Sequence, residues 1–449
     1  MSEGTIAAVA TAPGPAGVAV VRVSGPEAFA VAARLTGVAV TRRGMFFRKV
    51  YAVAAGQGLG TGDGGTVRGG VIDEAVVLAF RAPQSYTGED VVEFQCHGGV
   101  VTPRRVLEAC LAAGARLARR GEFTERAFLN GRLDYDQAES VLDLIQAKTA
   151  RAADAALEGL AGRRTRALRD LYDRALNLSS ELEHALDIDE GGLSDAFFAG
   201  VRSSFAALAA ALDAAAVRVR EGWILRDGAR VVLAGPPNAG KSSLLNALLG
   251  ESRAIVSDVP GTTRDAVEAW LDLDGWPVRL VDTAGLRTTG DAIEAEGVAR
   301  AEQLIADADV VIALACRGVG AAGQREGAAA CLPVHAKCDL GRGAGLNVSA
   351  KTGEGLAELK RVIVAALEAR AASAAAESSS DTPDDQTLAV LLDARAQLTP
   401  FLRADGSELD LVLAGNAVRA VAERLGARIG ATYSADLLDN LFSRFCVGK

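Results

Sequence analysis

The chain has 449 residues, of which 49% are hydrophobic and 23% charged, a composition typical of globular domains and unlike that of disordered proteins. Its formal net charge of −9 argues against a general electrostatic affinity for nucleic acid, and its three histidines exclude a histidine-rich metal site. Six cysteines without a CxxC pair indicate neither a zinc site nor a disulfide framework.

No run of about 18 apolar residues is free of charge, and no basic segment precedes the apolar residues at the N-terminus. We therefore expect a cytoplasmic protein with no membrane anchor. The length predicts about three domains.

Residues 1–119 alternate β-like runs with turns and predict a small α+β domain. The runs "TIAAVAT", "GVAVVRVSG", "EAVVLAF" and "DVVEFQC" have strand composition. The segment "VTPRRVLEACLAAGA" has helical spacing, and Pro26 suits the first turn of a helix through Leu35. Six arginines lie in and after this segment. They form either a local basic face or, as is more common, a solvated helix face with interspersed glutamates. They are Arg104, Arg105, Arg116, Arg119, Arg120 and Arg126.

Residues 120–219 lose the strand-like runs and predict the first part of a helical domain. In "DQAESVLDLIQAKTARAADAALEGL", the apolar residues Ala138, Val141, Leu142 and Ile145 fall on one helical face. Helical patterning returns at 371–449, after the polar linker "SAAAESSSDTPDDQ".

Residues 220–370, between these two helical parts, alternate strands with helices. The strand-like runs are "ARVVLAG", "PVRLVDT" and "ADVVIALA", and such alternation predicts a mostly parallel sheet covered by helices. The fold class is therefore multidomain, with an α/β domain inserted into an all-α domain.

The segment "GPPNAGKS" follows a strand and precedes a helix, which is the context that a phosphate-binding P-loop requires. Gly235 and Gly240 allow backbone N–H groups to face phosphates, and the helix adds its positive N-terminal end. Lys241 supplies a charge to the β- and γ-phosphates, and the Ser242 hydroxyl can bind Mg²⁺.

Further motifs follow in the order typical of GTPases. Asp282 in "DTAG" stands where a carboxylate holds Mg²⁺ through water, and Thr263 in "PGTTRD" is the second expected Mg²⁺ ligand. Asp339 in "AKCD" can accept two hydrogen bonds from guanine, and "SAKTG" completes the base site. The residues expected to contact GTP are Asn238, Ala239, Gly240, Lys241, Ser242, Ser243, Ser257, Asp258, Val259, Pro260, Gly261, Thr262, Thr263, Asp282, Thr283, Ala284, Gly285, Lys337, Asp339, Ser349, Ala350 and Lys351.

Three features depart from the usual GTPase pattern. Ala336 replaces the asparagine of the guanine motif, which we expect to weaken GTP binding about fivefold while guanine preference persists. Residues 315–335 are short and rich in glycine and alanine, so this flank of the domain is expected to be trimmed. Leu286 cannot orient water by hydrogen bonding, so another residue or a cation must do so.

The GTPase motifs, together with "GEFTERAFLNGRLDYDQAE" and the terminal "FCVGK", resemble the tRNA-modification GTPase family MnmE (TrmE), from "TIAAVATAPG" to the last residue. The resemblance implies a homodimer joined through the N-terminal domains, with a flavoprotein partner, MnmG, in a heterotetramer or larger complex. Together they would add an aminomethyl-type or carboxymethylaminomethyl group to C5 of the wobble uridine of certain tRNAs.

The resemblance also assigns residues and cofactors. A tetrahydrofolate in its 5-formyl or 5,10-methylene form would be bound by Arg22, Glu93, Arg132 and Lys449, although Arg22 and Glu93 also suit ordinary strand-face charges. K⁺ would be bound by Asn238, Ser257, Val259 and Thr262. Glu294 corresponds to the family's water-orienting glutamate, and a solvated carboxylate at a helix start is the alternative.

Two other functions fit the GTPase motifs. A ribosome-assembly GTPase would share all of them but would carry a basic RNA-binding module, and a regulatory nucleotide-binding module with little turnover would suit Ala336.

The tail "FCVGK" places Cys446 near the C-terminus, where it could be a lipid-attachment site, a functional thiol or the last buried residue of a helix. Glycine and a final lysine make "CVGK" a poor prenylation motif. The preceding apolar stripe, which includes Leu441, Phe442 and Phe445, predicts a helix docked on the helical domain, with residues 446–449 projecting from its end. Because the resemblance places the tail near the tRNA-modifying centre, Cys446 is a candidate catalytic thiol.

Overall fold

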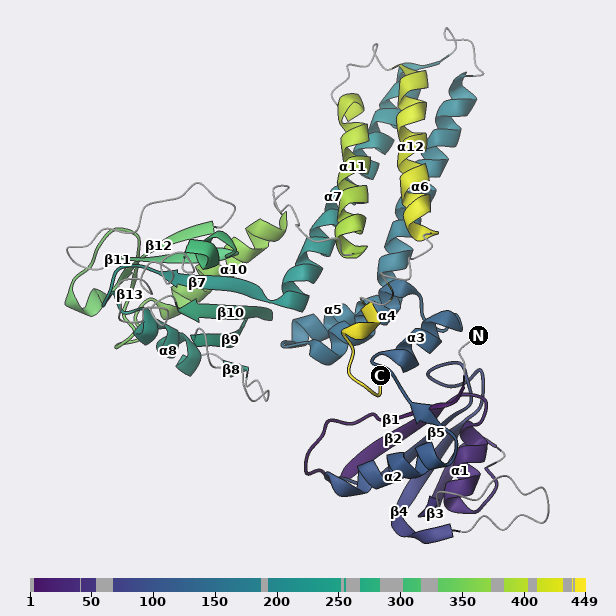
Figure 1. The fold of residues 1–449 in the computed structure, drawn as a ribbon. Coiled ribbons are helices and arrows are strands. Elements are labelled where there is room, and N and C mark those ends of the chain that lie inside the picture. The colour runs from purple at the N-terminus through teal and green to yellow at the C-terminus, as the bar shows by residue number, and fades with distance from the viewer. Residues whose placement is uncertain are drawn as a thin grey trace. The chain divides into compact units, whose positions relative to one another are not determined.

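The structure, a computed structural model, describes residues 4–40, 42–53, 68–186, 193–251, 254–255, 267–282, 302–315, 330–372, 383–402, 410–430, 438 and 441–449. The chain divides into two compact units (Figure 1). Unit 1 contains Met1–Leu142 together with Thr432–Lys449, and unit 2 contains Asp143–Ala431. The two ends of the chain therefore belong to one unit.

Unit 1 is built on a sheet with the strand order β3-β4-β5-β2-β1-β6. Neighbouring strands are antiparallel except for β1 and β6, which are parallel. The strands are β1 (Ile6–Val9), β2 (Val18–Ser24), β3 (Gly44–Val53), β4 (Arg68–Phe80), β5 (Val91–His97) and β6 (Arg116–Leu117). The α+β prediction for this region is confirmed, with β3 and β6 added to the predicted strands.

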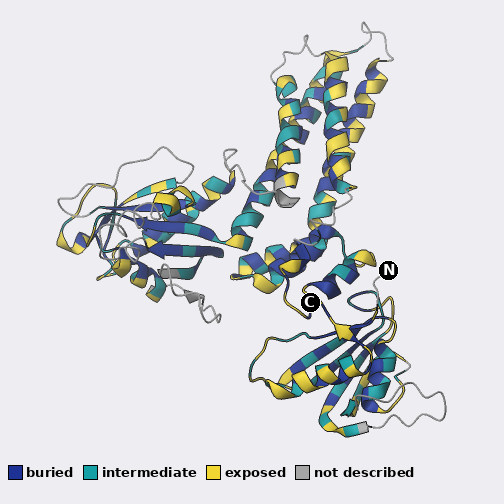
Figure 2. Ribbon diagram, in the orientation of Figure 1, coloured by how far each residue is buried: buried dark blue, intermediate teal, exposed yellow. Residues whose placement is uncertain are grey.

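Two helices, α1 (Ala28–Thr36) and α2 (Val101–Ala112), pack against this sheet. Alternate residues such as Val21, Val23 and Phe94 are buried with the apolar sides of both helices in one core (Figure 2). Pro26 lies in the turn before α1 rather than in its first turn, since the helix begins two residues later.

Unit 1 is completed by α3 (Glu122–Leu129), the start of α4 (Tyr135–Gln146) and the C-terminal residues. Ala138, Val141 and Leu142 of α4 are buried as predicted, but Ile145 is 49% exposed, so its assignment to the buried face is wrong. Ile145 lies in the last turn of α4, where about half of its side chain stays exposed to solvent.

The helical part of unit 2 consists of α5 (Ala150–Leu160), α6 (Arg163–Leu186), α7 (Asp195–Asp227), α11 (Pro383–Leu402) and α12 (Leu411–Ile429). Residues from the last four share one apolar core, which confirms that helices on both sides of the inserted region form one domain. In the described part of the chain, α7 is long and apolar enough by composition to cross a membrane. Its residues Val201, Phe205 and Leu212 are, however, buried in this core.

The predicted linker is shorter than expected at its C-terminal end. Its last four residues, "PDDQ", form the first turn of α11, where proline and acidic side chains are favoured.

The inserted part of unit 2 is a sheet with the order β13-β12-β11-β7-β10-β9-β8. Strands β13 to β10 in this order are parallel neighbours, and only β9 and β8 add antiparallel pairs, which confirms the mostly parallel prediction. The strands are β7 (Ala229–Ala234), β8 (Ala254–Ile255), β9 (Val267–Leu273), β10 (Trp276–Asp282), β11 (Val310–Ala315), β12 (Ala330–Ala336) and β13 (Leu346–Val348). Helices α8 (Lys241–Glu251) and α10 (Leu356–Ala372) share its main core.

Candidate functional site

The P-loop connects β7 to α8, as its sequence predicts. Gly235 has φ 152°, and a Cβ atom there would lie 2.7 Å from the Leu314 carbonyl oxygen, so only glycine fits. Lys241, at the first position of α8, is 7% exposed. Its Nζ donates to the carbonyl oxygens of Gly235 and Pro236 at 2.9 and 3.0 Å. The loop therefore curls around a buried ammonium group at the N-terminus of a helix, a geometry that suits phosphate.

A pair of hard oxygen ligands lies next to the loop. The Ser242 hydroxyl donates to Asp282 Oδ2 at 2.6 Å. Asp282 ends β10 and is 3% exposed, and it is held in register with Leu233 because β10 and β7 are parallel neighbours. A hydroxyl and a carboxylate are the ligands that Mg²⁺ prefers, so these residues fit the ion that the GTPase fold implies.

The guanine-motif residues lie at the same end of the sheet as the P-loop. The Lys337 ammonium donates to the Asn238 carbonyl oxygen at 2.7 Å, which ties the two loops together. The Ser349 hydroxyl donates to Asp339 Oδ1 at 2.7 Å and holds the carboxylate. Ala336 is a buried residue that ends β12 and offers no side-chain hydrogen bond.

The remaining P-loop and base-site residues sit on these same loops. Asn238 and Ser243 are exposed, Ala239 is buried, and Gly240 has φ 97°. Ala350 and Lys351 follow Ser349. Asn238 adopts φ 60°, in the left-handed region.

Other predicted residues fall outside the described part of the chain, so their roles remain predictions. They are Ser257, Asp258, Val259, Pro260, Gly261, Thr262, Thr263, Thr283, Ala284, Gly285, Leu286 and Glu294. Most of the segment 315–335 also lies outside it.

In unit 1 three of the four residues expected to bind folate gather beside the C-terminal tail. Arg22 Nε lies 2.7 Å from Glu93 Oε1, and both side chains are mostly buried, because β2 and β5 pair these residues directly. Arg22 Nη1 donates to the Gly448 carbonyl oxygen at 3.4 Å. Burial and the nearby Arg22 lower the pKa of the Lys449 ammonium, which Glu93 partly offsets.

Arg22 also lies over two aromatic rings, at 5.4 Å from the Tyr86 centroid and 5.5 Å from the Phe123 centroid. Cations, a carboxylate and aromatic faces could hold an anionic ring compound. Arg132, the fourth residue, is exposed in the loop after α3, where its Cγ lies near Gly88.

The tail does not project from the fold, so that expectation is wrong. Val447 forms an antiparallel bridge with Arg120, and the Gly121 N–H donates to the Cys446 carbonyl oxygen at 3.5 Å. Gly448 has φ 102°, and a Cβ atom there would lie 2.3 Å from the Val9 carbonyl oxygen. The small, positive-φ residue is what lets the tail lie against β1. Cys446 itself is exposed.

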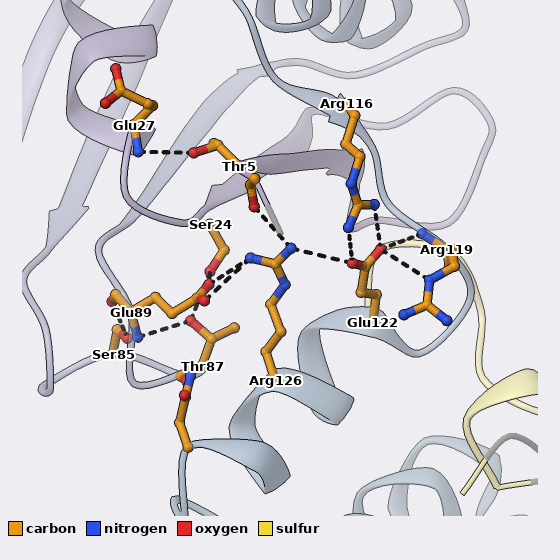
Figure 3. Close-up of polar contacts among 12 residues, drawn as sticks. Thr5, Ser24, Glu27, Ser85, Thr87, Glu89, Arg116, Arg119, Glu122 and Arg126 are labelled. Carbon is orange, nitrogen blue, oxygen red and sulfur yellow. Dashed lines mark hydrogen bonds and ion pairs between the residues drawn. The ribbon is translucent and has the colours of Figure 1, made fainter. Parts of the chain in front are cut away.

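Sequence reasoning missed a buried ion cluster around Glu122 and Arg126 of α3 (Figure 3). Arg126 is 1% exposed and binds Glu89 at 3.0 Å and Glu122 at 3.2 Å. Arg116 and Arg119 also pair with glutamates, and so does Arg104 on α2. These contacts favour interspersed glutamates over a basic face, although Arg126 is buried rather than solvated. The i, i+4 spacing of Glu122 and Arg126 was the available signal.

Comparisons with known proteins agree across the whole chain. A family model described as "GTP-binding protein TrmE N-terminus" matches residues 5–132, and one described as "MnmE helical domain" matches residues 136–446. Proteins named tRNA modification GTPase MnmE are 42% identical in Symbiobacterium thermophilum and 39% identical in Moorella thermoacetica, each over 100% of both chains. The Neisseria meningitidis serogroup B protein of that name is 40% identical over 99% of both chains. The chain therefore belongs to the MnmE (TrmE) family of tRNA modification GTPases.

Proposed function

We propose that the chain is a potassium-dependent GTP hydrolase that acts with a flavoprotein partner. Together they would add an aminomethyl-type or carboxymethylaminomethyl group to C5 of the wobble uridine of certain tRNAs. The names of the full-length relatives support the tRNA modification part of this proposal. The one-carbon unit would come from a tetrahydrofolate.

In hydrolysis, Lys241 holds the β- and γ-phosphates and neutralises the charge that develops between them. Ser242 and Asp282, already 2.6 Å apart, would hold Mg²⁺, directly and through water respectively. Bound Mg²⁺ supplies further charge neutralisation at the phosphates. Asn238, with Ser257, Val259 and Thr262, would bind K⁺, and Glu294 would orient the attacking water, with Thr263 as a second Mg²⁺ ligand.

Base recognition would rest on Asp339. Its carboxylate accepts one hydrogen bond from Ser349 and keeps capacity for the N1–H and N2–H groups of guanine, which adenine does not offer. The Lys337 stem, fixed by its bond to Asn238, would cover one face of the base.

The observation that carries the modification proposal is the position of the C-terminal residues beside Arg22 and Glu93. Arg22 contacts both the Glu93 carboxylate and the Gly448 carbonyl group, and Lys449 shares this environment. A folate carboxylate would find Arg22 and Lys449, and its ring would find the partly exposed Tyr86. Arg132 would join from the loop after α3, and Cys446 is an exposed thiol two residues before Gly448.

The exposed apolar residues of the edge strand β3 support a homodimer joined through unit 1. Met45 and Phe47 are 73% and 63% exposed, and as alternate residues they share one face of the strand.

The decisive test is nucleoside analysis of tRNA from a deletion strain. Wobble uridines should lose the C5 modification and regain it with the parent gene, but not with genes for Lys241→Ala or Arg22→Ala. Unchanged wobble uridines in the deletion strain would refute the proposal.

A regulatory nucleotide-binding module with little turnover is the second candidate, because Ala336 removes a base contact. Potassium separates the two: the enzyme should hydrolyse GTP faster in K⁺ than in Na⁺. Equal, slow rates in both salts would favour the module.

A further inference from the structure

The C-terminal tail docks on a short turn that precedes α3. We call Arg119, Arg120 and Gly121 the tail seat. Arg120 pairs with Val447 in an antiparallel bridge, and the Gly121 N–H donates to the Cys446 carbonyl oxygen at 3.5 Å. These backbone contacts fix which tail residue lies opposite which seat residue.

Docking of the tail on the seat requires the left-handed backbone conformation of Gly121. Gly121 has φ 67°, and a Cβ atom there would lie 2.4 Å from the Phe442 carbonyl oxygen. Phe442 in turn lies with its ring centroid 6.4 Å from that of Phe128 on α3. The tail therefore rests directly on main-chain atoms, and a change in the turn would shift the tail.

Glu122 closes this turn. Its Oε2 accepts hydrogen bonds from the Arg119 N–H at 2.8 Å and from Arg116 Nη1 at 2.9 Å (Figure 3). Its Oε1 accepts from Arg116 Nη2 and from Arg126 Nη2. The side chain is 2% exposed. One buried carboxylate thus ties the first seat residue to β6 and to α3.

Arg126 connects the Glu122 carboxylate to other parts of unit 1. It is 1% exposed and also bonds Glu89 at 3.0 Å and the Gly4 carbonyl oxygen at 3.0 Å. Burial alone would raise the pKa of Glu122, but the donors of Arg116, Arg119 and Arg126 lower it to about 2. The carboxylate is therefore charged at neutral pH, as its donors require.

Beyond the seat, the tail reaches the cluster around Arg22. Val447 is held by the seat, and Gly448 contacts Arg22. The charges of Arg22 and Glu93 both act on the Lys449 ammonium, Arg22 lowering its pKa and Glu93 raising it. A slip of one residue at the seat would move a different group to Arg22.

We propose that Glu122 is a positioning residue for tRNA modification: it closes the tail seat, and the seat sets the register that brings Gly448 and Lys449 to Arg22 and Glu93. This inference rests on the proposed function only for its consequence in tRNA modification. The docking of the tail is tested separately.

The central comparison is Glu122→Gln against Glu125→Gln in the full chain. Glu125 lies three residues after Glu122 on α3. It pairs with the Arg119 side chain at 2.9 Å, whereas the Arg119 backbone N–H donates to Glu122, so Glu125 is a matched control. In Glu122→Gln an amide N–H₂ faces arginine donors, and carboxypeptidase should release Lys449 about tenfold faster, the effect of losing one charge-assisted hydrogen bond. GTP hydrolysis should be unchanged, and the modification rate should fall by a similar factor.

Arg116→Lys is a second variant in case Glu122→Gln folds poorly. It removes the two-pronged contact from a half-exposed side chain and should accelerate Lys449 release in the same direction, to a smaller extent.

A disulfide rescue distinguishes seating from general stability. Arg120→Cys with Val447→Cys joins a bridged, exposed pair, whose antiparallel Cα spacing suits a disulfide. Formed in the Glu122→Gln chain and verified by peptide mapping, this bond should restore modification, and reduction should abolish it again.

The proposal is overturned if Glu122→Gln releases Lys449 at the rate of Glu125→Gln, or if the verified disulfide leaves modification low. If the parent protein itself modifies no tRNA, the proposed function fails, while the Lys449 release rates still decide whether Glu122 closes the seat.

Discussion

In unit 2 the residues proposed to bind nucleotide come from loops that follow parallel strands of one sheet, whereas in unit 1 the tail cluster joins residues from opposite ends of the chain. Lys241, Asp282 and Asp339 are brought together by the order of β7, β10 and β12 in one sheet. Arg22 and Gly448, by contrast, are 426 residues apart in sequence.

The difference teaches where each site is vulnerable. The nucleotide loops are set by strand–loop–helix segments and follow once their sheet forms. The tail cluster depends on a docked segment held by a few backbone contacts and by a buried ion cluster, so it can be lost while the sheet of unit 1 remains. Changes in one site should therefore leave the other intact.

The largest expected effect is that of Lys241→Ala. GTP hydrolysis should fall about 10²- to 10³-fold, the usual cost of removing a charged group from such a site. Single-turnover phosphate release at saturating GTP measures it. The release of Lys449 by carboxypeptidase should stay at the parent rate, and a faster release would break the independence of the two sites.

Gly448→Ala should undock the tail. At φ 102° with a main-chain oxygen 2.3 Å from the new Cβ, strain and clash should cost about 2 kcal/mol, or roughly 30-fold in the docking equilibrium. Hydrogen exchange of the amides of residues 441–449 reports it. Gly99→Ala is the control, because Gly99 has φ 113° but nothing within 4 Å of its Cβ position. Equal exchange in both variants would contradict the importance of this contact.

Acid should loosen unit 1 through Glu122. The pKa of this carboxyl is about 2 in the folded chain against an ordinary 4.5, so its stabilisation is fully present above pH 4.5 and is lost as the pH falls towards 2. The opening constant of unit 1 should rise about 20-fold between pH 5 and pH 3 beyond any rise in Glu122→Gln. Hydrogen exchange of α3 amides measures it, and parallel pH profiles of the two chains would refute it.

The smallest expected effect is a gain. Ala336→Asn should strengthen GTP binding about fivefold, since one neutral hydrogen-bonding side chain contributes about 1 kcal/mol. Isothermal titration with GTP and ATP measures it, and ATP binding should not change. An unaltered GTP affinity would mean that another group already compensates for Ala336.

The two sites also differ in how far the sequence alone predicts them. The P-loop, Asp282 and Asp339 were placed from local motifs, because strand order in a parallel sheet brings such loops together. The expected folate-binding roles of Arg22, Glu93 and Lys449 come only from the family resemblance, since nothing local links β2 to the C-terminus. The sequence predicts Arg126 as a surface charge, but the residue is buried, because its partner Glu89 lies 37 residues earlier and no local pattern indicates that contact.

The docked tail has a consequence for how the protein is made. The residues of the tail seat leave the ribosome long before the tail, and all of unit 2 is synthesised in between. Unit 1 can thus reach its complete form only after the tail has been synthesised, and a chain that stops before the tail would leave Arg22 without its contact to Gly448. An affinity tag fused after Lys449 would follow directly on a half-buried residue, and its first residues would disturb the contacts that this residue makes.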